Sequence, residues 1–305
     1  YRLRGKDSPL EKDTNLEQKE VSELIVLLSN PNKWHRHTAV RLLGERKYPG
    51  AATKLKRLIA ESDGLGALNA LWALHQSTGL DDEASVAGLK HSYPAVRMWT
   101  ARLLGDEWGL NRNLGAGRHG RGKGTIPSDV FRALLSQAEV ETDPEVLAQF
   151  ASTARRLDPE QAFPLVTAVM QHKDLRRDAY VPLLCWWVFE AHIPAANDLV
   201  LASLKSPALW DEPIVFEHIL PRLVRRYAVE GKRADLLLCA ELFRAAPKPI
   251  HAEQLMKGIE EGFPGRPMTG LPQELVAAVA KSGQASLAFR LKQGEPAAVA
   301  EALRR

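Results

Sequence analysis

The sequence predicts an all-α protein of the HEAT-like α-solenoid class, a right-handed superhelix of antiparallel helix pairs. Two observations predict it. A helical motif recurs along the first half of the chain, and the alternation of apolar and polar residues typical of a strand occurs only at residues 1–4. One helix pair cannot bury its apolar face alone, so stacked pairs form a continuous core. The composition agrees, since 45% of the 305 residues are hydrophobic and 26% are charged, as in ordinary folded chains.

The repeat is clearest between residues 34–45 and residues 95–106, which align at an offset of 61 residues. In the second copy, apolar and small side chains fall at i, i+3, i+4, i+7 and i+8, which is the spacing of one buried helix stripe. An intermediate copy around Ala67 divides this offset, so the period is about 30 residues. A fourth copy begins near residue 143, where Leu147 replaces the arginine of the earlier copies.

Each unit is predicted to open with a shorter apolar helix, expected at residues 17–29, 51–62 and 82–90 in the first three units. A turn then leads to the helix that carries the stripe. Pro94 suits the first turn of such a helix, because the amide hydrogen it lacks would have no partner there. Less regular pairs are expected at 159–172 with 175–191, 196–205 with 213–229, 232–245 with 251–262, and 272–283 with 285–293.

The periodicity divides the chain into four segments. Residues 1–14 are interpreted as the end of a preceding domain or a linker, and residues 15–108 as HEAT-like repeats. Residues 109–127 form a Gly/Arg-rich insertion loop, and residues 128–305 hold further, more divergent HEAT-like helix pairs. Because the sequence starts at Tyr1 and ends within a helical pattern, we expect a fragment of a longer protein.

The insertion loop supplies the candidate binding residues. It has six glycines and no acidic residue. Its four basic residues are Arg112, Arg118, Arg121 and Lys123. Flexible cationic segments pair readily with polyanions, so these side chains are candidates for contacting phosphates or an acidic partner. Overall, 41 basic residues exceed 37 acidic ones, and the excess lies in the first 125 residues, with 20 basic against 14 acidic.

Two phosphate-binding patterns within the loop are interpreted as chance matches. Residues 115–120 fit G-x-G-x-x-G, but no strand is predicted before them, and that motif acts only where a strand feeds a helix. Residues 117–123 approach a phosphate-binding loop, yet Gly124 stands where a hydroxyl would hold magnesium. A surface insertion between repeats explains this composition more simply.

No pattern predicts a catalytic residue, a metal ligand or a cofactor site in this chain. Cys185 and Cys239 lie in apolar helical runs, and two thiols cannot build a disulfide framework or a thiolate metal cluster. His192 and His218 lack partners at ligand spacing and are interpreted as helix-surface residues. The longest apolar run, residues 181–189, has about half of the ~20 residues that a membrane span needs, so no span is expected.

The tryptophans are interpreted as core residues. Trp186 and Trp187, with Leu183, fit the buried stripe of a long helix. The same interpretation applies to Trp34, Trp72 and Trp99.

Arg36 and Arg97 occupy equivalent positions in two copies of the repeat. They suit either an electropositive surface for nucleic acid or a ladder that bridges to acids or carbonyls of the neighbouring repeat. The ladder is favoured, because each arginine lies beside the core stripe and no stacking aromatic side chains are evident near it.

Four stretches carry a resemblance to a known family. They are Asn-Pro-Asn-Lys-Trp-His-Arg at 30–36, Ala-Leu-Trp-Ala-Leu-His at 70–75, Tyr-Pro-Ala-Val-Arg at 93–97 and Tyr-Val-Pro-Leu-Leu-Cys-Trp-Trp at 180–187. Together they are similar to the helical region of the planctomycete-type membrane-bound dehydrogenases, also called PVC-type haem-binding CxxCH proteins. The resemblance spans roughly residues 1 to 190.

The resemblance implies a β-propeller before the helical repeats, a cytochrome c domain after them, and an extracytoplasmic, periplasmic setting. Residues 1–4 would then be the closing strand of the propeller. The chain contains no C-x-x-C-H, so neither sugar oxidation nor haem binding can be assigned to a residue here. No cofactor is expected in this chain, and haem c is expected only elsewhere in the parent protein.

These observations leave two functional hypotheses. The first is a non-catalytic scaffold, the central part of a larger protein resembling a haem-dependent membrane-bound dehydrogenase, which contacts a protein partner or neighbouring domains. The second is a stand-alone HEAT-repeat protein that binds nucleic acid or an acidic protein partner through its basic N-terminal half. An enzyme site would need carboxylates and aromatic residues gathered in one pocket, and the sequence shows no such cluster.

Overall fold

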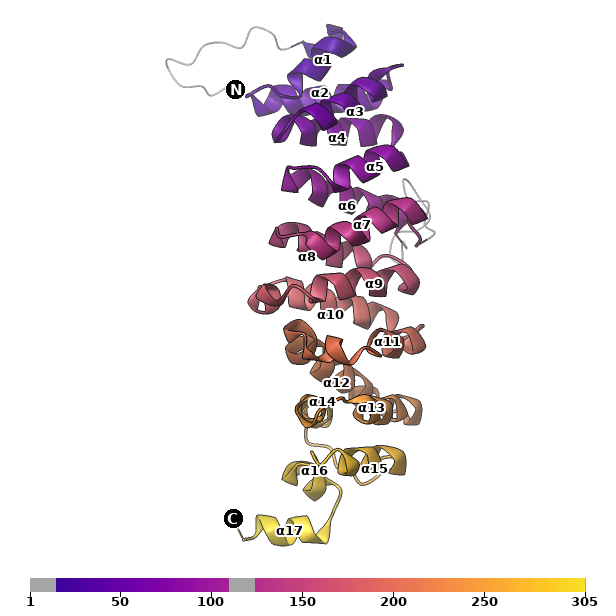
Figure 1. The fold of residues 1–305 in the computed structure, drawn as a ribbon, viewed down its shortest axis with the longest axis vertical. Coiled ribbons are helices and arrows are strands. Elements are labelled where there is room, and N and C mark those ends of the chain that lie inside the picture. The colour runs from indigo at the N-terminus through magenta and orange to yellow at the C-terminus, as the bar shows by residue number, and fades with distance from the viewer. Residues whose placement is uncertain (1–14, 110–123, 305) are drawn as a thin grey trace, which may run out of the picture. The chain divides into compact units, whose positions relative to one another are not determined.

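The computed structural model describes residues 15–109 and 124–304, and every regular element within these ranges is a helix (Figure 1). The all-α prediction is therefore confirmed for these residues. The strand expected at residues 1–4 and the basic side chains of Arg112, Arg118, Arg121 and Lys123 lie outside them. The chain separates into two compact units, residues 1–104 with 127–133 and residues 105–126 with 134–305, which are described in turn.

The first unit is a succession of short helices that pack on their neighbours in sequence. α2 packs against α1 and α4, and α3 packs against α1, α4 and α5. The helices are η1 Leu16–Gln18, α1 Val21–Leu27, α2 Lys33–Arg46, α3 Ala51–Glu61, α4 Leu65–Thr78, α5 Asp82–Leu89, most of α6 Pro94–Trp108 and the start of α7 Ser128–Val140. The opening helices predicted at 51–62 and 82–90 are confirmed.

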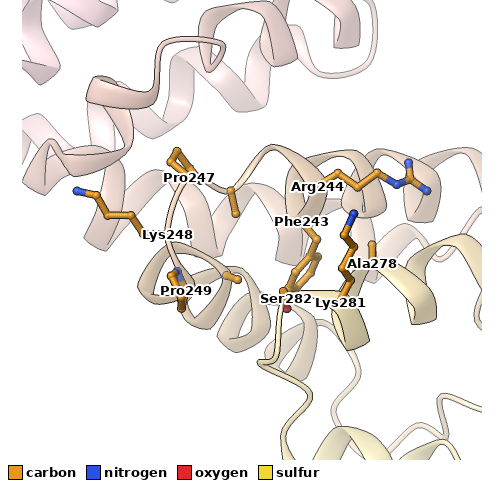
Figure 2. A pocket seen from close by; sticks show the side chains of 10 residues that line it. Phe243, Arg244, Pro247, Lys248, Pro249, Ala278, Lys281 and Ser282 are labelled. Carbon is orange, nitrogen blue, oxygen red and sulfur yellow. The ribbon is translucent and has the colours of Figure 1, made fainter.

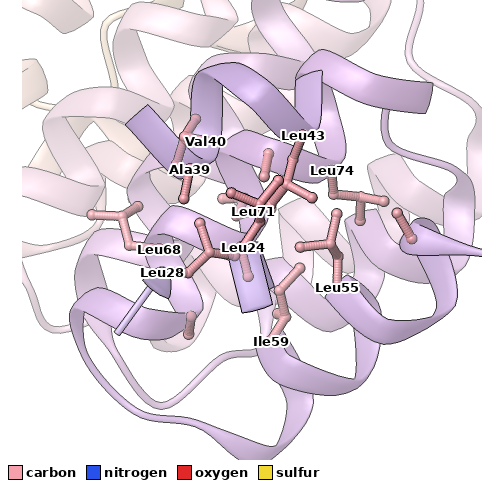
Figure 3. Packing of buried hydrophobic residues seen from close by; sticks show 14 of the residues in the cluster. Leu24, Leu28, Ala39, Val40, Leu43, Leu55, Ile59, Leu68, Leu71 and Leu74 are labelled. Atoms are coloured by element: carbon pink, nitrogen blue, oxygen red, sulfur yellow. The ribbon is translucent and has the colours of Figure 1, made fainter. Parts of the chain in front are cut away.

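The core of this unit is made by one leucine-rich stripe from each helix. Leu24 of α1, Leu43 of α2, Leu55 of α3 and Leu71 of α4 meet in one cluster and are fully buried (Figure 3). Burying a leucine side chain contributes about 1.5–3 kcal/mol, so each helix depends on its neighbours for stability. This burial confirms the stripe spacing read from the sequence.

One predicted helix starts later than expected. The sequence favoured a helix at residues 17–29, but the chain forms a short 3-10 turn at Leu16–Gln18 and α1 begins only at Val21. The side chain of Glu20 accepts the amide of Glu23, and the side chain of Glu23 accepts the amide of Glu20 at 3.0 Å. This capping box satisfies two amides at the helix start and fixes the boundary there.

The repeat seen in the sequence recurs in the hydrogen bonds of the turns. Arg36 Nη1 donates to the carbonyl oxygens of Asn30 and Pro31, at 2.7 and 2.9 Å. Arg97 Nη1 donates to the carbonyl oxygens of His91 and of the following residue, also at 2.7 and 2.9 Å. Each arginine therefore closes the turn of its own helix pair, whereas the sequence had favoured a bridge to the next repeat.

A side chain inside each turn completes this arrangement. Asn30 Oδ1 accepts the amide of the second residue after it at 2.8 Å, and His91 Nδ1 does the same at 3.0 Å. In the second unit, Glu141 Oε1 accepts the amide of Asp143 at 3.0 Å in the corresponding turn. Leu147 occupies the position that corresponds to Arg36 and Arg97. This turn therefore keeps its acceptor side chain, Glu141, although the arginine is replaced.

The second unit is also built from helices that contact near neighbours along the chain. α8 packs against α9 and α10, α9 against α11, α12 against α13 and α14, and α13 against α15. Its helices, besides parts of α6 and α7, are α8 Pro144–Ala154, α9 Pro159–Met170, η2 Lys173–Arg177, α10 Val181–His192, α11 Asn197–Ser203, η3 Pro207–Asp211, the π-helical turn η4 Val215–Ile219, α12 Leu220–Glu230, α13 Arg233–Ala245, α14 Pro249–Gly262, α15 Gln273–Lys281, α16 Leu287–Lys292 and α17 Pro296–Ala302.

The prediction of a single helix at residues 175–191 is wrong. The chain forms a 3-10 turn that ends at Arg177, and α10 starts at Val181. Asp178 Oδ1 accepts the amides of Tyr180 and Val181 at 2.8 and 2.9 Å. An aspartate that binds amides two and three residues later favours a new helix start over continuation of the previous helix.

Two glycines allow α12 and α14 to approach closely. A Cβ at Gly258 would lie 2.3 Å from the carbonyl oxygen of Pro221, and one at Gly262 would lie 2.5 Å from Cβ of Ala228. These glycines are four residues apart and therefore share one face of α14. Only glycine leaves room for the α12 backbone at this contact.

Two histidines hydrogen-bond to a carbonyl at or near the end of an earlier helix. His91 Nε2 lies 2.9 Å from the carbonyl oxygen of Ile59, at the end of α3, and His172 Nε2 lies 2.7 Å from that of Ala138, near the end of α7. A carbonyl only accepts, so Nε2 carries the proton in both rings. His192, predicted at a helix surface, is buried, because it faces Phe163 across the interior.

None of the described helices is long and apolar enough to cross a membrane.

We expect Arg36→Leu to lower the free energy of unfolding by about 1–3 kcal/mol, because two charge-assisted hydrogen bonds to turn carbonyls are lost. Urea unfolding followed by circular dichroism measures this change. Arg41→Leu, which removes only the exposed ion pair with Glu45 at 2.8 Å, is the matched control and should cost less than about 1 kcal/mol. Equal losses for the two variants would contradict the assigned role of Arg36.

Candidate interaction surfaces

The described residues contain no group of three or more His, Cys, Asp or Glu side chains that could hold a metal ion. Cys185 and Cys239, which lie in apolar helical runs, are both buried. Burial raises the pKa of both thiols, so they remain protonated at neutral pH and are poor nucleophiles. Exposed helix faces are therefore the candidate interaction surfaces of the described residues.

Aromatic side chains form a row on α2, α4 and α6 in the first unit. The His37 and Trp72 rings are 6.4 Å apart, and the Trp72 and Trp99 rings are 4.9 Å apart, both in edge-to-face geometry. The guanidinium of Arg102 lies 4.9 Å from the centre of the Trp99 ring. Trp72 and Trp99 are half-buried and pack against the core of this unit, whereas Trp34 is exposed, so the prediction of a core position is wrong for Trp34. Aromatic residues gather on this surface, which was not evident from the sequence.

A cavity of about 320 Å³ adjoins this aromatic row. Its lining residues are His37, Val40, Arg41, Trp72 and Gln76. The Nε1 atom of Trp72 is buried and has no hydrogen-bond acceptor among the described residues. An unsatisfied buried donor is costly, so an acceptor atom of a bound molecule would be favourable at this position.

An apolar stripe on α10 is exposed in the second unit. Leu183 and Trp187 are four residues apart on one face of α10, and Tyr180 is the N-cap residue directly before the helix. The exposed fractions of Tyr180, Leu183 and Trp187 are 71%, 39% and 37%. The guanidinium of Arg155 lies 5.8 Å from the centre of the Trp187 ring. Trp186 is buried as predicted, but Leu183 and Trp187 are not, because α10 buries the face that carries Cys185 and Phe189.

A groove runs between α13 and α15 in the second unit. A cavity of about 680 Å³ is lined there by Arg233, Arg244, Gln273, Glu274, Ala277, Ala278 and Lys281. Next to it, a cavity of about 270 Å³ lies beside the turn between α13 and α14 and is also lined by Arg244 and Lys281 (Figure 2). Arg244 lines a third cavity, of about 520 Å³, with Trp210 and Lys205. Arg244 therefore lines all three cavities.

Acidic partners hold some of the cations near this groove but not others. Arg233 Nη2 lies 2.6 Å from Oε1 of Glu274. Lys248 Nζ lies 2.7 Å from both carboxylate oxygens of Asp211 and lowers the pKa of that carboxyl. No carboxylate of the described residues forms an ion pair with Arg244 or Lys281.

The pair of Lys248 and Asp211 also holds a buried histidine. His251 Nε2 lies 3.2 Å from Oδ1 of Asp211, and the rings of Trp210 and Phe216 pack around the imidazole. Burial lowers the pKa of His251 more than the nearby Asp211 raises it, so the ring is neutral at physiological pH. This cluster fixes η3 on α14 and accounts for the position of Lys248.

The sequence singled out none of these three surfaces. Its candidate residues, Arg112, Arg118, Arg121 and Lys123, lie outside the described residues. The exposed stripe on α10 had a usable signal, since Tyr180, Leu183 and Trp187 repeat at helical spacing, but the sequence does not show which stripe faces solvent.

The fold and these surfaces place the chain among all-α proteins with exposed aromatic and cationic faces. Comparison with protein-family models, with curated proteins and with solved structures gives no match.

Proposed function

We propose that the chain is a non-catalytic interaction scaffold, an α-solenoid of HEAT-like helix pairs that binds a protein partner or neighbouring domains. The observation that carries the proposal is the exposed stripe of Tyr180, Leu183 and Trp187 on α10. Tyrosine, tryptophan and arginine dominate the energetics of protein interfaces, and Arg155 already lies against Trp187. A protein partner that covered this stripe would bury apolar surface that now faces water.

The solenoid part of the proposal is supported by how the helices contact one another within each unit. Most contacts are between a helix and the next helix in the chain, or the one after that, as in a stack of helix pairs. The same turn recurs, with Arg36 and Arg97 making identical hydrogen bonds. Repeated units with repeated turns are the arrangement that HEAT-like proteins use to present long surfaces.

To test the proposal, the wild-type chain and the variant Tyr180→Glu/Trp187→Glu are used as baits in an extract of the source organism. Captured proteins are compared by quantitative mass spectrometry. We expect a protein that binds the wild type directly and whose capture falls at least tenfold with the variant, since two charges on an apolar interface are strongly unfavourable.

The matched control is Lys54→Gln/Lys257→Gln, which changes the net charge by the same two units at exposed positions on α3 and α14. This control should retain the partner. Identical captured sets for the wild type and the α10 variant, with both folded by circular dichroism, would count against the proposal.

We further propose that the scaffold is the central part of an extracytoplasmic protein resembling a haem-dependent membrane-bound dehydrogenase. The support is the resemblance of residues 30–36, 70–75, 93–97 and 180–187 to that family's helical region. The coding sequence on either side tests it. A propeller-like sequence upstream and a C-x-x-C-H motif downstream are expected, and a start codon directly before Tyr1 with a stop codon directly after Arg305 would refute it.

A second candidate function is binding of single-stranded nucleic acid by the first unit. The aromatic row of His37, Trp72 and Trp99 favours it, because partly exposed aromatic rings stack bases and neighbouring arginines contact phosphates. Arg41 and Arg102 flank the row and would contact phosphates.

For this second function, we expect a labelled single-stranded oligonucleotide to bind at low salt, with an affinity that falls steeply as salt rises. Fluorescence anisotropy measures the binding. The variant Arg118→Gln/Arg121→Gln/Lys123→Gln should weaken binding, and Trp99→Ala, which removes a ring of the aromatic row, should reduce it without changing the salt dependence. The absence of binding at about 50 mM salt would exclude this function.

A further inference from the structure

Two cations that form no ion pair with a carboxylate of the described residues, Arg244 and Lys281, meet at one end of the groove between α13 and α15, and Arg244 has only a longer-range attraction to Glu274, which is paired with Arg233. Arg244 lies in the last turn of α13 and Lys281 in the last turn of α15, and both side chains are exposed. They line the same two cavities, of which Figure 2 shows the smaller. The smaller cavity is lined by three cations and no carboxylate, and of these cations only Lys248 is neutralised, by Asp211.

The helix ends do not neutralise this charge. A helix C-terminus presents about half a negative charge, so the ends of α13 and α15 together offset roughly one of the two positive charges of Arg244 and Lys281. About one positive charge therefore remains over an open cavity. A bound anion would relieve the repulsion between the two side chains and would gain charge-assisted hydrogen bonds from both.

The shape of the groove suits an extended chain. From Arg233 to Arg244 the helix α13 advances eleven residues, which is about 16 Å at 1.5 Å per residue. An extended peptide covers that length with about five residues. Ala277 and Ala278 make a shallow wall that admits a peptide backbone, and Gln273 offers both a donor and an acceptor.

The lining favours a peptide over a nucleic acid. No aromatic residue lines the larger cavity, and Phe243, the aromatic residue that lines the smaller one, is 4% exposed, so the groove offers no free ring on which a base could stack. At the opposite end of the larger cavity Arg233 is paired with Glu274, so the positive charge without an ion pair is concentrated at Arg244 and Lys281, where carboxylate side chains can bind.

We propose that this groove binds a short acidic peptide segment of a partner protein, with its carboxylates at Arg244 and Lys281. The site deepens the proposed scaffold function by naming the chemistry of a partner segment. The groove is a different surface from the α10 stripe, so partner binding at the stripe and peptide binding at the groove can be disproved independently.

The test uses the full chain and a fluorescein-labelled peptide with six consecutive glutamates, in fluorescence anisotropy at about 50 mM salt. The same peptide with six glutamines is the uncharged comparison. We expect the glutamate peptide to bind, the glutamine peptide not to bind, and Arg244→Gln/Lys281→Gln to raise the Kd at least about tenfold, since two charge-assisted contacts are lost.

Two further variants separate this site from general charge attraction. Lys54→Gln/Lys257→Gln removes the same net charge elsewhere and should change the Kd less than about twofold. Ala277→Trp keeps every charge but fills the groove, and it should also weaken binding at least about tenfold, because the peptide is sterically excluded. Tyr180→Glu/Trp187→Glu should leave this Kd unchanged even if it abolishes capture of a partner.

The proposal is overturned if the glutamate peptide does not bind at this salt, if the glutamine peptide binds equally, or if Arg244→Gln/Lys281→Gln binds like the wild type. Tighter binding of a single-stranded oligonucleotide that depends on the same two cations would also overturn it in favour of nucleic acid. Circular dichroism of each variant establishes that the helices are retained.

Discussion

The constraint on which this structure depends is the need to satisfy carbonyl groups at many helix ends. A helix leaves its last four carbonyls without intrahelical partners, and the described helices are short, so such ends are frequent. Side chains from elsewhere in the chain supply the missing donors. Asn69 donates to Leu28, His91 to Ile59 and His172 to Ala138, and in each case the bond joins a helix end to a later helix or turn. These hydrogen bonds thereby join segments that are about 30 to 40 residues apart in the sequence.

The helices could be predicted from the sequence because apolar spacing reports which residues share a face. Their boundaries depend on side-chain acceptors that act over two or three residues. Glu20 delays α1, and Asp178 separates η2 from α10, yet neither changes the apolar pattern. Arg36 was placed correctly beside the core, but its partners are carbonyls of its own turn. A side chain's position along a helix does not by itself show how far that side chain reaches.

The surfaces were harder to predict for a different reason. Arg244 and Lys281 each look like an ordinary cation in the last turn of a helix, and only the packing of α13 against α15 brings them to the same cavities. Trp187 lies in an apolar run in which adjacent residues such as Val188 and Phe189 are both buried, so the sequence does not show that Trp187 is the one that faces solvent. The aromatic row of the first unit depends on Gly44, since a Cβ there would lie 2.7 Å from Cβ of Gln76 on α4.

The burial of both native cysteines has a practical consequence for studying these surfaces. Cys185 and Cys239 are the only thiols in the sequence, and both are inaccessible and protonated at neutral pH. A cysteine placed at an exposed position would therefore react with a maleimide label or a cross-linker far faster than either native thiol. A reporter group can therefore be attached at each surface for site-directed spectroscopy without removal of the native cysteines, because these react too slowly to be labelled.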